Sequence, residues 1–272
     1  MSEHRLVGVF DSGVGGLSVV LEMRRRMPWL DIIYVSDACH LPYGEKEEHF
    51  IRERAFVIAD FLVAEGAHAL VIACNTATAA AADALRAHFA LPIVGIEPAV
   101  KPAAQATRSG IVGILATAST LQSSRYEELL RRFGQFTRVL GQPARGLVEC
   151  VEAGDFDGPR TRTLLAHYLR PLLEAGADTI VLGCTHYPFL LPAIRDLVGP
   201  EVRIIDPGEA VARRVGEVLG EWDDGDMGSL RCYTSGDPAA QQTSIARLLG
   251  EGVTVLALPE CPGAHRCGAS GG

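Results

Sequence analysis

Apolar residues follow two alternating patterns along most of the chain. Short continuous apolar runs predict buried strands, and longer segments with apolar residues every three or four positions predict amphipathic helices. In the first part this predicts strands over residues 5–10, 31–35, 69–73 and 92–96 and helices over residues 17–27, 45–65 and 77–89. Such an alternation is typical of parallel sheets built from strand–helix–strand units.

The alternation starts again near residue 98. It predicts strands over residues 110–115, 137–140, 179–182 and 202–205 and helices over residues 98–106, 121–133, 161–175 and 189–198. We interpret this as a weak internal repeat; chance similarity between strand–helix–strand units is the alternative. One more helix is expected over residues 209–219. Two candidate strands, 231–234 and 253–256, are expected to join the first half.

The predicted fold class is therefore α/β, with two pseudo-symmetric domains that each contain a mainly parallel sheet flanked by helices. We expect residues 1–97 and 210–262 to form the first domain and residues 98–209 to form the second. Residues 263–272 are rich in Gly and small side chains, and we expect a disordered tail there.

Each half contains an apolar run that ends at a cysteine. Residues 69–73 lead into Cys74, and residues 179–183 lead into Cys184. A buried strand would present such a thiol at its carboxyl end, where open α/β sheets bind ligands. Two such thiols could face one substrate from opposite sides, as two-sided proton chemistry at one carbon requires. Packing is the alternative for each residue, because a buried cysteine often acts as a small apolar side chain.

The neighbours of the two cysteines also match in kind. Asn75 and Thr76 follow the first thiol, and Thr185 and His186 follow the second. At a helix start such residues cap free N–H groups or hold a carboxylate. A thiol needs a lowered pKa to act as a base near neutrality, and an adjacent imidazole lowers it. His186 could assist Cys184 in this way, and Asp11 could accept or relay the proton of Cys74.

Two loops are further candidates for ligand contacts. Gly13, Gly15 and Gly16 follow Asp11 and Ser12 and precede a helix, which suits an anion at the helix N-terminus. The fit to a dinucleotide-binding motif is poor, and a simple packing turn remains open. In the turn at residues 37–44, the Tyr43 hydroxyl and the Gly44 N–H could reach a bound carboxylate, and Thr117 could do the same in the second half.

Composition narrows the function classes. The 272 residues are 48% hydrophobic with a net charge of −8 and no basic stripe, so we expect a real core and no nucleic-acid partner. We expect no signal peptide and no membrane span, and we expect the seven cysteines to be mostly reduced thiols in the cytoplasm. Neither Lys46 nor Lys101 sits in a convincing cradle for pyridoxal phosphate, and no standard zinc spacing occurs. No cofactor and no metal are expected.

Four motifs carry a resemblance to a known family. They are Phe10-Asp11-Ser12-Gly13-Val14-Gly15-Gly16-Leu17, Pro42-Tyr43-Gly44, Cys74-Asn75-Thr76-Ala77-Thr78 and Gly183-Cys184-Thr185-His186-Tyr187-Pro188. The chain resembles the cofactor-independent glutamate racemases over about residues 5–212.

The resemblance implies a two-domain fold with the active site in the cleft between the domains. It implies that Cys74 and Cys184 are the two acid/base residues, assisted by Asp11 and His186. An assisting glutamate of the family falls on Glu152, with Glu149 as a nearby alternative. The substrate-binding residues implied are Asp11, Ser12, Pro42, Tyr43, Gly44, Asn75, Thr76, Thr117, Thr185 and His186.

The family supplies D-glutamate for peptidoglycan, and thereby for cell-wall biogenesis and cell shape, in the bacterial cytoplasm. A homodimer is compatible with the resemblance. Two alternatives stay open: an aspartate or similar racemase with paired cysteines, and a catalytically silent two-lobed amino-acid-binding protein. His186 favours glutamate over aspartate, because the aspartate enzymes resemble a Gly-Cys-Thr-Glu string at this place.

Overall fold

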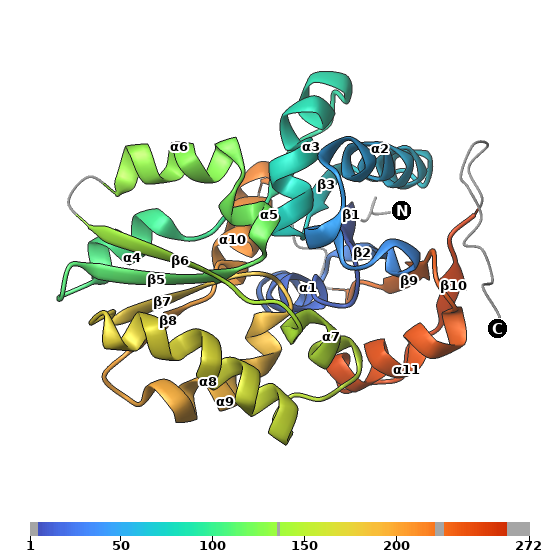
Figure 1. Ribbon diagram of the computed structural model, residues 1–272. Coiled ribbons are helices and arrows are strands. Elements are labelled where there is room, and N and C mark those ends of the chain that lie inside the picture. The colour runs from blue at the N-terminus through green and yellow to red at the C-terminus, as the bar shows by residue number, and fades with distance from the viewer. Residues whose placement is uncertain (1–4, 135–136, 221–225, 260–272) are drawn as a thin grey trace.

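The computed structural model describes residues 5–134, 137–220 and 226–259, and in them the chain builds two parallel sheets (Figure 1). The six-stranded sheet has the order β10-β9-β2-β1-β3-β4, and the four-stranded sheet has the order β6-β5-β7-β8. All strand pairs are parallel. The predicted fold class is confirmed.

The elements of the first sheet come from both ends of the described chain. Its strands are β1 Leu6–Asp11, β2 Asp31–Ser36, β3 Ala69–Ile72, β4 Ile93–Gly95, β9 Leu230–Thr234 and β10 Val255–Ala257. The helices around it are α1 Leu17–Arg26, α2 Glu48–Ala64, α3 Asn75–His88, α10 Gly208–Leu219 and α11 Pro238–Leu249, with 3₁₀ turns at Ala38–His40 and Tyr43–Glu45.

The second sheet is built from the middle of the chain. Its strands are β5 Ile111–Ala116, β6 Arg138–Pro143, β7 Thr179–Gly183 and β8 Arg203–Ile205. Its helices are α4 Val100–Ala106, α5 Ala118–Leu121, α6 Ser124–Phe133, α7 Leu147–Glu152, α8 Pro159–Glu174 and α9 Leu191–Val198, with a 3₁₀ turn at Tyr187–Leu190.

Alternating side chains of each strand explain how helices cover both faces of a sheet. Val7 and Val9 of β1 pack on the side of α1 and α10, whereas Phe10 packs on the side of α2 and α3. In the second sheet, Val112 and Ile114 face α4 and α6, and Leu115 joins the core with α8 and α9. Figure 1 shows the helices above and below both sheets.

The two halves share a strand order. The order β2-β1-β3-β4 in the first sheet has its counterpart in β6-β5-β7-β8 of the second. Cys74 therefore follows the strand that corresponds to the strand before Cys184. This agreement supports the internal repeat that the sequence predicts.

Some element predictions differ from the structure. The helix expected over residues 121–133 begins at Ser124, because Ser123 caps α6 by accepting the Tyr126 N–H, and Leu121 instead ends the separate short helix α5. The sequence analysis missed α7 and α11. Strands β9 and β10 pair with the first sheet, as expected, but the exact domain boundaries stay a prediction. The tail expected at 263–272 lies outside the described residues.

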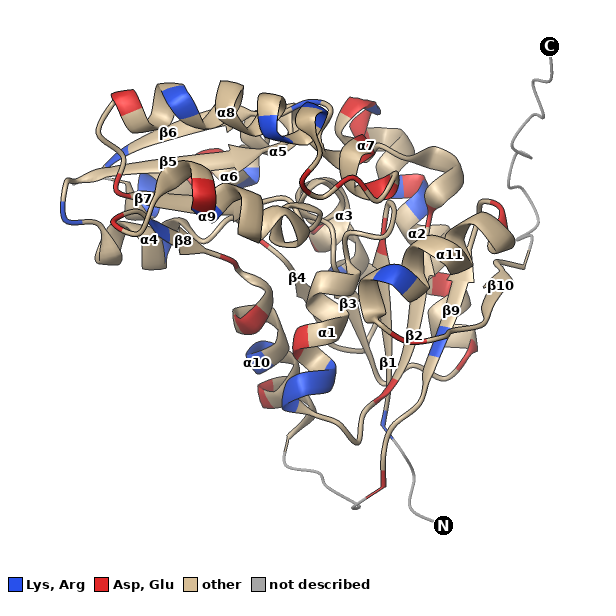
Figure 2. Ribbon diagram, turned by 90° about the horizontal axis from the view of Figure 1, so that it is seen from below, with Lys and Arg blue, Asp and Glu red and all other residues tan. Residues whose placement is uncertain are grey.

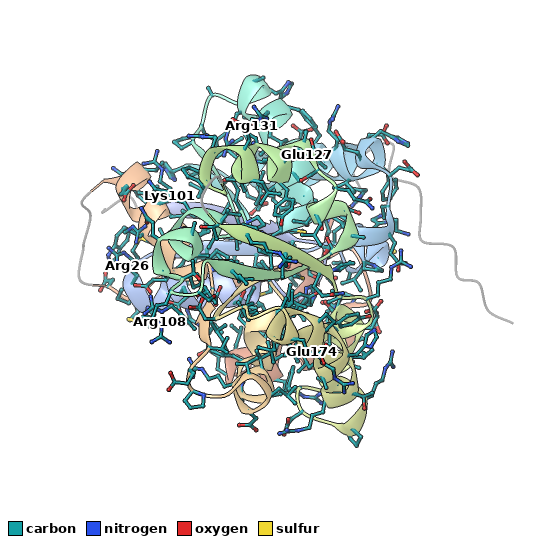
Figure 3. The ribbon with its side chains drawn as sticks, turned by 60° about the vertical axis from the view of Figure 1, so that its left-hand side comes forward. Arg26, Lys101, Arg108, Glu127, Arg131 and Glu174 are labelled. Atoms are coloured by element: carbon teal, nitrogen blue, oxygen red, sulfur yellow. The ribbon has the colours of Figure 1, made fainter. Side chains whose placement is uncertain are left out.

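Lys and Arg positions alternate with Asp and Glu positions along the ribbons of both halves (Figure 2). On α6, for example, Glu127 and Arg131 are exposed and project outward (Figure 3), while Tyr126 points into the core. Within the described part of the chain, no helix combines the length and apolar character that a membrane crossing needs.

Candidate active site

The carboxyl ends of the central strands of both sheets meet at one small cavity. It has a volume of about 20 Å³, which is room for about one water molecule. The residues that line it are Asp11, Ser12, Pro42, Tyr43, Gly44, Cys74, Asn75, Thr76, Thr117, Val148, Gly183, Cys184, Thr185 and His186. The structure thus brings together every site residue that the sequence predicts except Glu152, which lies behind His186. Val148 and Gly183 are additional lining residues.

Cys74 lies where β3 ends and α3 begins. As the N-cap of that helix, its Sγ accepts the Ala77 N–H at 3.5 Å, and the thiol lies 4.0 Å from the Ser12 hydroxyl. Burial raises the pKa of the Cys74 thiol well above its ordinary value, and the nearby Asp11 charge adds to this rise. Cys74 is therefore held as a protonated thiol in this structure.

Asp11 ends β1 and connects the two halves. Its Oδ1 accepts the Ser12 N–H at 2.6 Å, and its Oδ2 accepts the Thr185 hydroxyl at 2.9 Å. Burial raises the pKa of Asp11, although the charge of His186 and these hydrogen bonds oppose the rise. The carboxyl group can therefore take up a proton beside Cys74 more readily than an exposed aspartate could.

Cys184 directly follows β7, the equivalent strand. It contacts an imidazole, whereas Cys74 contacts a hydroxyl. Its Sγ lies 3.7 Å from Nδ1 of His186, and Nε2 of His186 lies 2.8 Å from Oε1 of Glu152. Burial lowers the pKa of His186, but the hydrogen bonds to Cys184 and Glu152 outweigh burial and raise this pKa well above its usual value. A charged imidazole next to the sulfur stabilises a thiolate.

Of the two candidate glutamates on α7, only Glu152 contacts His186. Glu149 is exposed, whereas the Glu152 side chain is 15% exposed and also accepts the Val14 N–H at 2.8 Å. The Val14 contact is notable because Val14 belongs to the glycine-rich loop of the other half.

The glycine-rich loop packs directly against the His186–Glu152 pair. A Cβ on Gly13 would lie 2.0 Å from Oε1 of Glu152, and a Cβ on Gly15 would lie 2.3 Å from Nδ1 of His186. Glycine at these two positions thus permits a close approach of one half to the catalytic candidates of the other.

The turn over residues 42–44 forms another wall of the cavity. The Tyr43 hydroxyl donates to Oδ2 of Asp37 at 2.6 Å, and the side chain is 1% exposed. This hydroxyl is thus bound to Asp37, and its contact with a substrate carboxylate stays a prediction. Across the cavity, the Thr76 and Thr117 hydroxyls lie 3.0 Å apart and join the two halves.

Comparisons with known proteins identify the family. A family model described as Asp/Glu/hydantoin racemase matches residues 22–215. The glutamate racemase of Ectopseudomonas mendocina is 54% identical over 249 residues, which cover 90% of this chain and 95% of that protein. The chain belongs to the glutamate racemase family. As a member it is an isomerase.

Solved structures of this family share the fold. Glutamate racemase isoform RacE1 from Bacillus anthracis is 33% identical with a TM-score of 0.87, covering 94% of this chain and 97% of that chain. The Escherichia coli glutamate racemase in complex with L-glutamate and the activator UDP-MurNAc-ala is 37% identical with a TM-score of 0.83, covering 94% and 98%. An aspartate racemase from Picrophilus torridus, at 16% identity and a TM-score of 0.51, shows similarity of fold alone.

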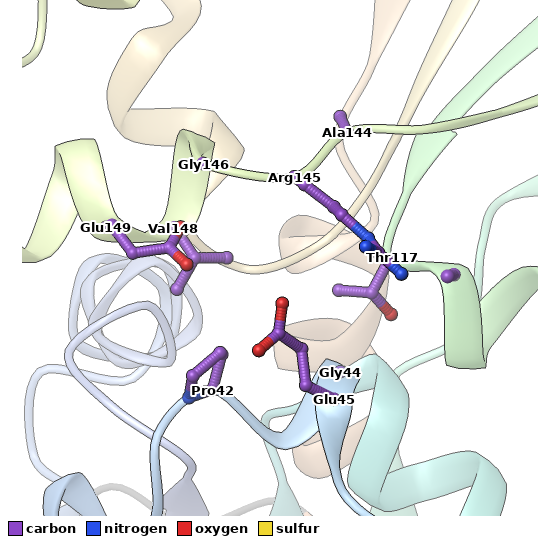
Figure 4. A pocket seen from close by; sticks show the side chains of 10 residues that line it. Pro42, Gly44, Glu45, Thr117, Ala144, Arg145, Gly146, Val148 and Glu149 are labelled. Carbon is purple, nitrogen blue, oxygen red and sulfur yellow. The ribbon is translucent and has the colours of Figure 1, made fainter.

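A second pocket of about 30 Å³ adjoins the cavity. Pro42, Gly44, Thr117 and Val148 line both pockets. Charged side chains from both halves surround the second pocket, and Figure 4 shows Glu45 on one side and Arg145 and Glu149 on the other. Sequence reasoning missed Val148 and Arg145, because only tertiary packing brings these residues to the two pockets.

None of the residues that line the cavity with the two thiols is a lysine. Lys46 and Lys101 both lie outside this cavity, and Lys101 sits over the Phe133 ring. In residues 5–134, 137–220 and 226–259, no group of three or more His, Cys, Asp or Glu side chains is arranged to hold a metal ion. Cys74, Cys150, Cys184 and Cys232 are free, whereas Cys39 is disulfide-bonded, so most of these five cysteines are free thiols.

Proposed function

We propose that this chain interconverts L-glutamate and D-glutamate without a cofactor, with Cys74 and Cys184 as the two acid/base residues. The observation that carries the proposal is that equivalent strands of the two sheets bring these two thiols to one cavity. The family membership and the names of the relatives support glutamate as the substrate.

The surroundings of the thiols support a division of labour. Cys184 has the charged His186 beside it, so we assign to Cys184 the removal of the Cα proton of L-glutamate. Burial and Asp11 keep Cys74 protonated, so it delivers a proton to the opposite face. In the reverse direction the roles exchange, and Asp11 accepts or relays the Cys74 proton. Each such step is general acid–base catalysis worth about 10²–10⁴-fold.

The remaining cavity residues would hold the substrate. Main-chain N–H groups and hydroxyls suit the two carboxylates of glutamate, since both are hydrogen-bond acceptors. The residues proposed for this role are Asp11, Ser12, Pro42, Tyr43, Gly44, Asn75, Thr76, Thr117, Thr185 and His186. For Tyr43 the contact would come from its main chain, because its hydroxyl is bound to Asp37.

The biological role follows from the product. We propose that the chain supplies D-glutamate for peptidoglycan, in the bacterial cytoplasm. A homodimer stays a prediction.

Deuterium incorporation tests the two-thiol proposal. When L-glutamate reacts in D₂O, the early D-glutamate should carry deuterium at Cα while recovered L-glutamate stays protiated, because each face has its own thiol. Racemisation followed by circular dichroism should be lost in Cys74→Ala and in Cys184→Ala. Cys232→Ala is the matched control, because Cys232 is a free buried thiol outside the cavity.

Three outcomes contradict parts of the proposal. Deuterium in recovered L-glutamate at low conversion indicates a single base that serves both faces. Near-normal racemisation by either alanine variant assigns that thiol to packing. Glutamate binding without any racemisation by the unmodified protein favours a binding protein.

A further inference from the structure

A buried ion pair lies beneath the turn that walls the cavity. Asp37, which follows β2, is fully buried, and Arg54 on α2 is 8% exposed. Nε and Nη2 of Arg54 donate to Oδ2 and Oδ1 of Asp37 at 3.0 Å and 2.8 Å. The reaction proposed above uses neither residue.

The same carboxylate anchors the turn itself. Its Oδ2 accepts the Tyr43 hydroxyl at 2.6 Å, and Tyr43 lies between Pro42 and Gly44, both of which line the cavity. The Asp37 N–H also donates to the main-chain oxygen of Asp11 at 2.9 Å. The ion pair is therefore connected to the Pro42–Gly44 wall of the cavity through Tyr43, and to the end of β1 through Asp11.

Stability alone does not account for this pair. Moving a carboxylate and a guanidinium out of water costs several kcal/mol, and apolar residues of similar volume often stabilise a fold equally well. What the pair adds is geometry, because the two parallel hydrogen bonds of a guanidinium fork fix both partners. Burial alone would raise the pKa of Asp37, but the Arg54 hydrogen bonds and charge outweigh burial and lower it, so the carboxylate stays ionised.

We propose that Asp37 and Arg54 are positioning residues that hold the Pro42–Gly44 turn, through Tyr43, at the place where the substrate binds. The proposal rests on the proposed glutamate racemisation. It places the effect on substrate binding rather than on the proton transfers, because neither residue touches a thiol, His186 or Glu152.

Steady-state kinetics test the proposal. Tyr43→Phe removes one hydrogen bond to a charged group and should raise KM for L-glutamate and for D-glutamate by about tenfold, with kcat changed less than about threefold. Arg54→Met should raise KM further, and Arg54→Lys, which keeps the charge but loses the fork, should fall between Arg54→Met and the wild type. Arg231→Met is the matched control, because Arg231 pairs with Glu65 at the end of α2, away from the cavity.

A pH profile separates positioning from general destabilisation. The groups that face Asp37 are Arg54 from α2, Tyr43, His40 from the preceding 3₁₀ turn, and Ser235 after β9. In Arg54→Met the carboxyl group is buried without its cation, so its pKa should rise by several units. KM of this variant should then increase with pH as the unpaired carboxylate forms and the turn is displaced. The double variant Asp37→Asn/Arg54→Met retains His40 and should show no such increase.

The outcomes are distinct. Unchanged KM in Tyr43→Phe overturns the proposal, even if Arg54→Met does not fold. A fall in kcat without a rise in KM in Tyr43→Phe also overturns it. The same pH dependence of KM in Arg54→Met and in the double variant overturns it as well. If the unmodified protein does not racemise glutamate at all, the proposed function fails instead.

Discussion

Gly15→Ala tests whether the glycine-rich loop leaves the space that the imidazole of His186 needs for its proposed role. The Cβ of an alanine would lie 2.3 Å from Nδ1, 2.6 Å from Cε1 and 2.8 Å from Cγ of His186. The backbone of Gly15 is not in the left-handed region, so the added methyl group acts through this contact and not through backbone strain.

The size of the effect follows from the distance. Ordinary van der Waals contact begins at about 3.4 Å, so the ring has to move by about 1 Å. His186 is 2% exposed and is held between Cys184 and Glu152, so this movement breaks at least one of the two contacts. A misplacement of about 1 Å can cost about 10²-fold in rate, and overpacking of this kind destabilises a fold by about 1–3 kcal/mol.

We therefore expect kcat/KM of glutamate racemisation, followed by circular dichroism, to fall about 10²-fold in Gly15→Ala. Because the equilibrium constant of a racemisation is one, the loss in kcat/KM must be equal in both directions. Gly252→Ala is the control, since Gly252 has no atom within 4 Å of the added Cβ and no left-handed backbone. A folded Gly15→Ala enzyme with kcat/KM within threefold of the control would refute the reasoning.

Two further predictions concern pH and stability. Because the pKa of His186 is raised in the folded state, its contribution to stability is complete below its unfolded pKa of about 6.5 and is lost as pH rises through the folded value. Thermal unfolding should show Glu152→Gln less stable than the wild type near pH 6, with the difference shrinking toward pH 9; a constant difference would contradict this. Asp178 accepts the N–H groups of Arg108 and Ser109 at 2.7 and 2.8 Å, and its pKa is far below the usual value, mainly through hydrogen bonds that outweigh burial. Urea unfolding of Asp178→Ala should show a loss of about 2–3 kcal/mol in the free energy of unfolding at pH 7, and a smaller loss below pH 3. The kcat of the folded enzyme should not change, because Asp178 lies away from the cavity. A fall in kcat would contradict this prediction.

The pairing of the thiols was predictable from the sequence. Two similar strand-to-cysteine strings in two parallel sheets must place Cys74 and Cys184 at equivalent strand ends, and the carboxyl ends of such strands bind ligands. The choice between Glu149 and Glu152 was not predictable. It depends on α7, a six-residue helix that is too short to show a period, and on where that helix packs.

Helix α11 and the buried Arg54 were also not predicted from the sequence. Helix α11 buries only Ile245, so its pattern carries little apolar signal. Arg54, in contrast, left a signal that was not used: it lies on the buried face of α2 beside Ala55, between Ile51 and Ile58. A charged residue at such a position implies a buried partner of opposite charge. The partner itself, Asp37, could be found only from the fold.

At Cys74 the helix cap and the proposed acid/base role favour different side chains. Hydroxyl and carboxylate side chains are the best N-caps, and the second half uses one: Thr117 caps α5 by accepting the Thr120 N–H at 3.2 Å. At the start of α3 the cap is a sulfur atom with a longer contact of 3.5 Å. A serine there would suit the helix better, but under the proposed mechanism it could not replace the thiol as an acid or base. A substitution at Cys74 that stabilises the helix start is therefore expected to remove the proposed activity.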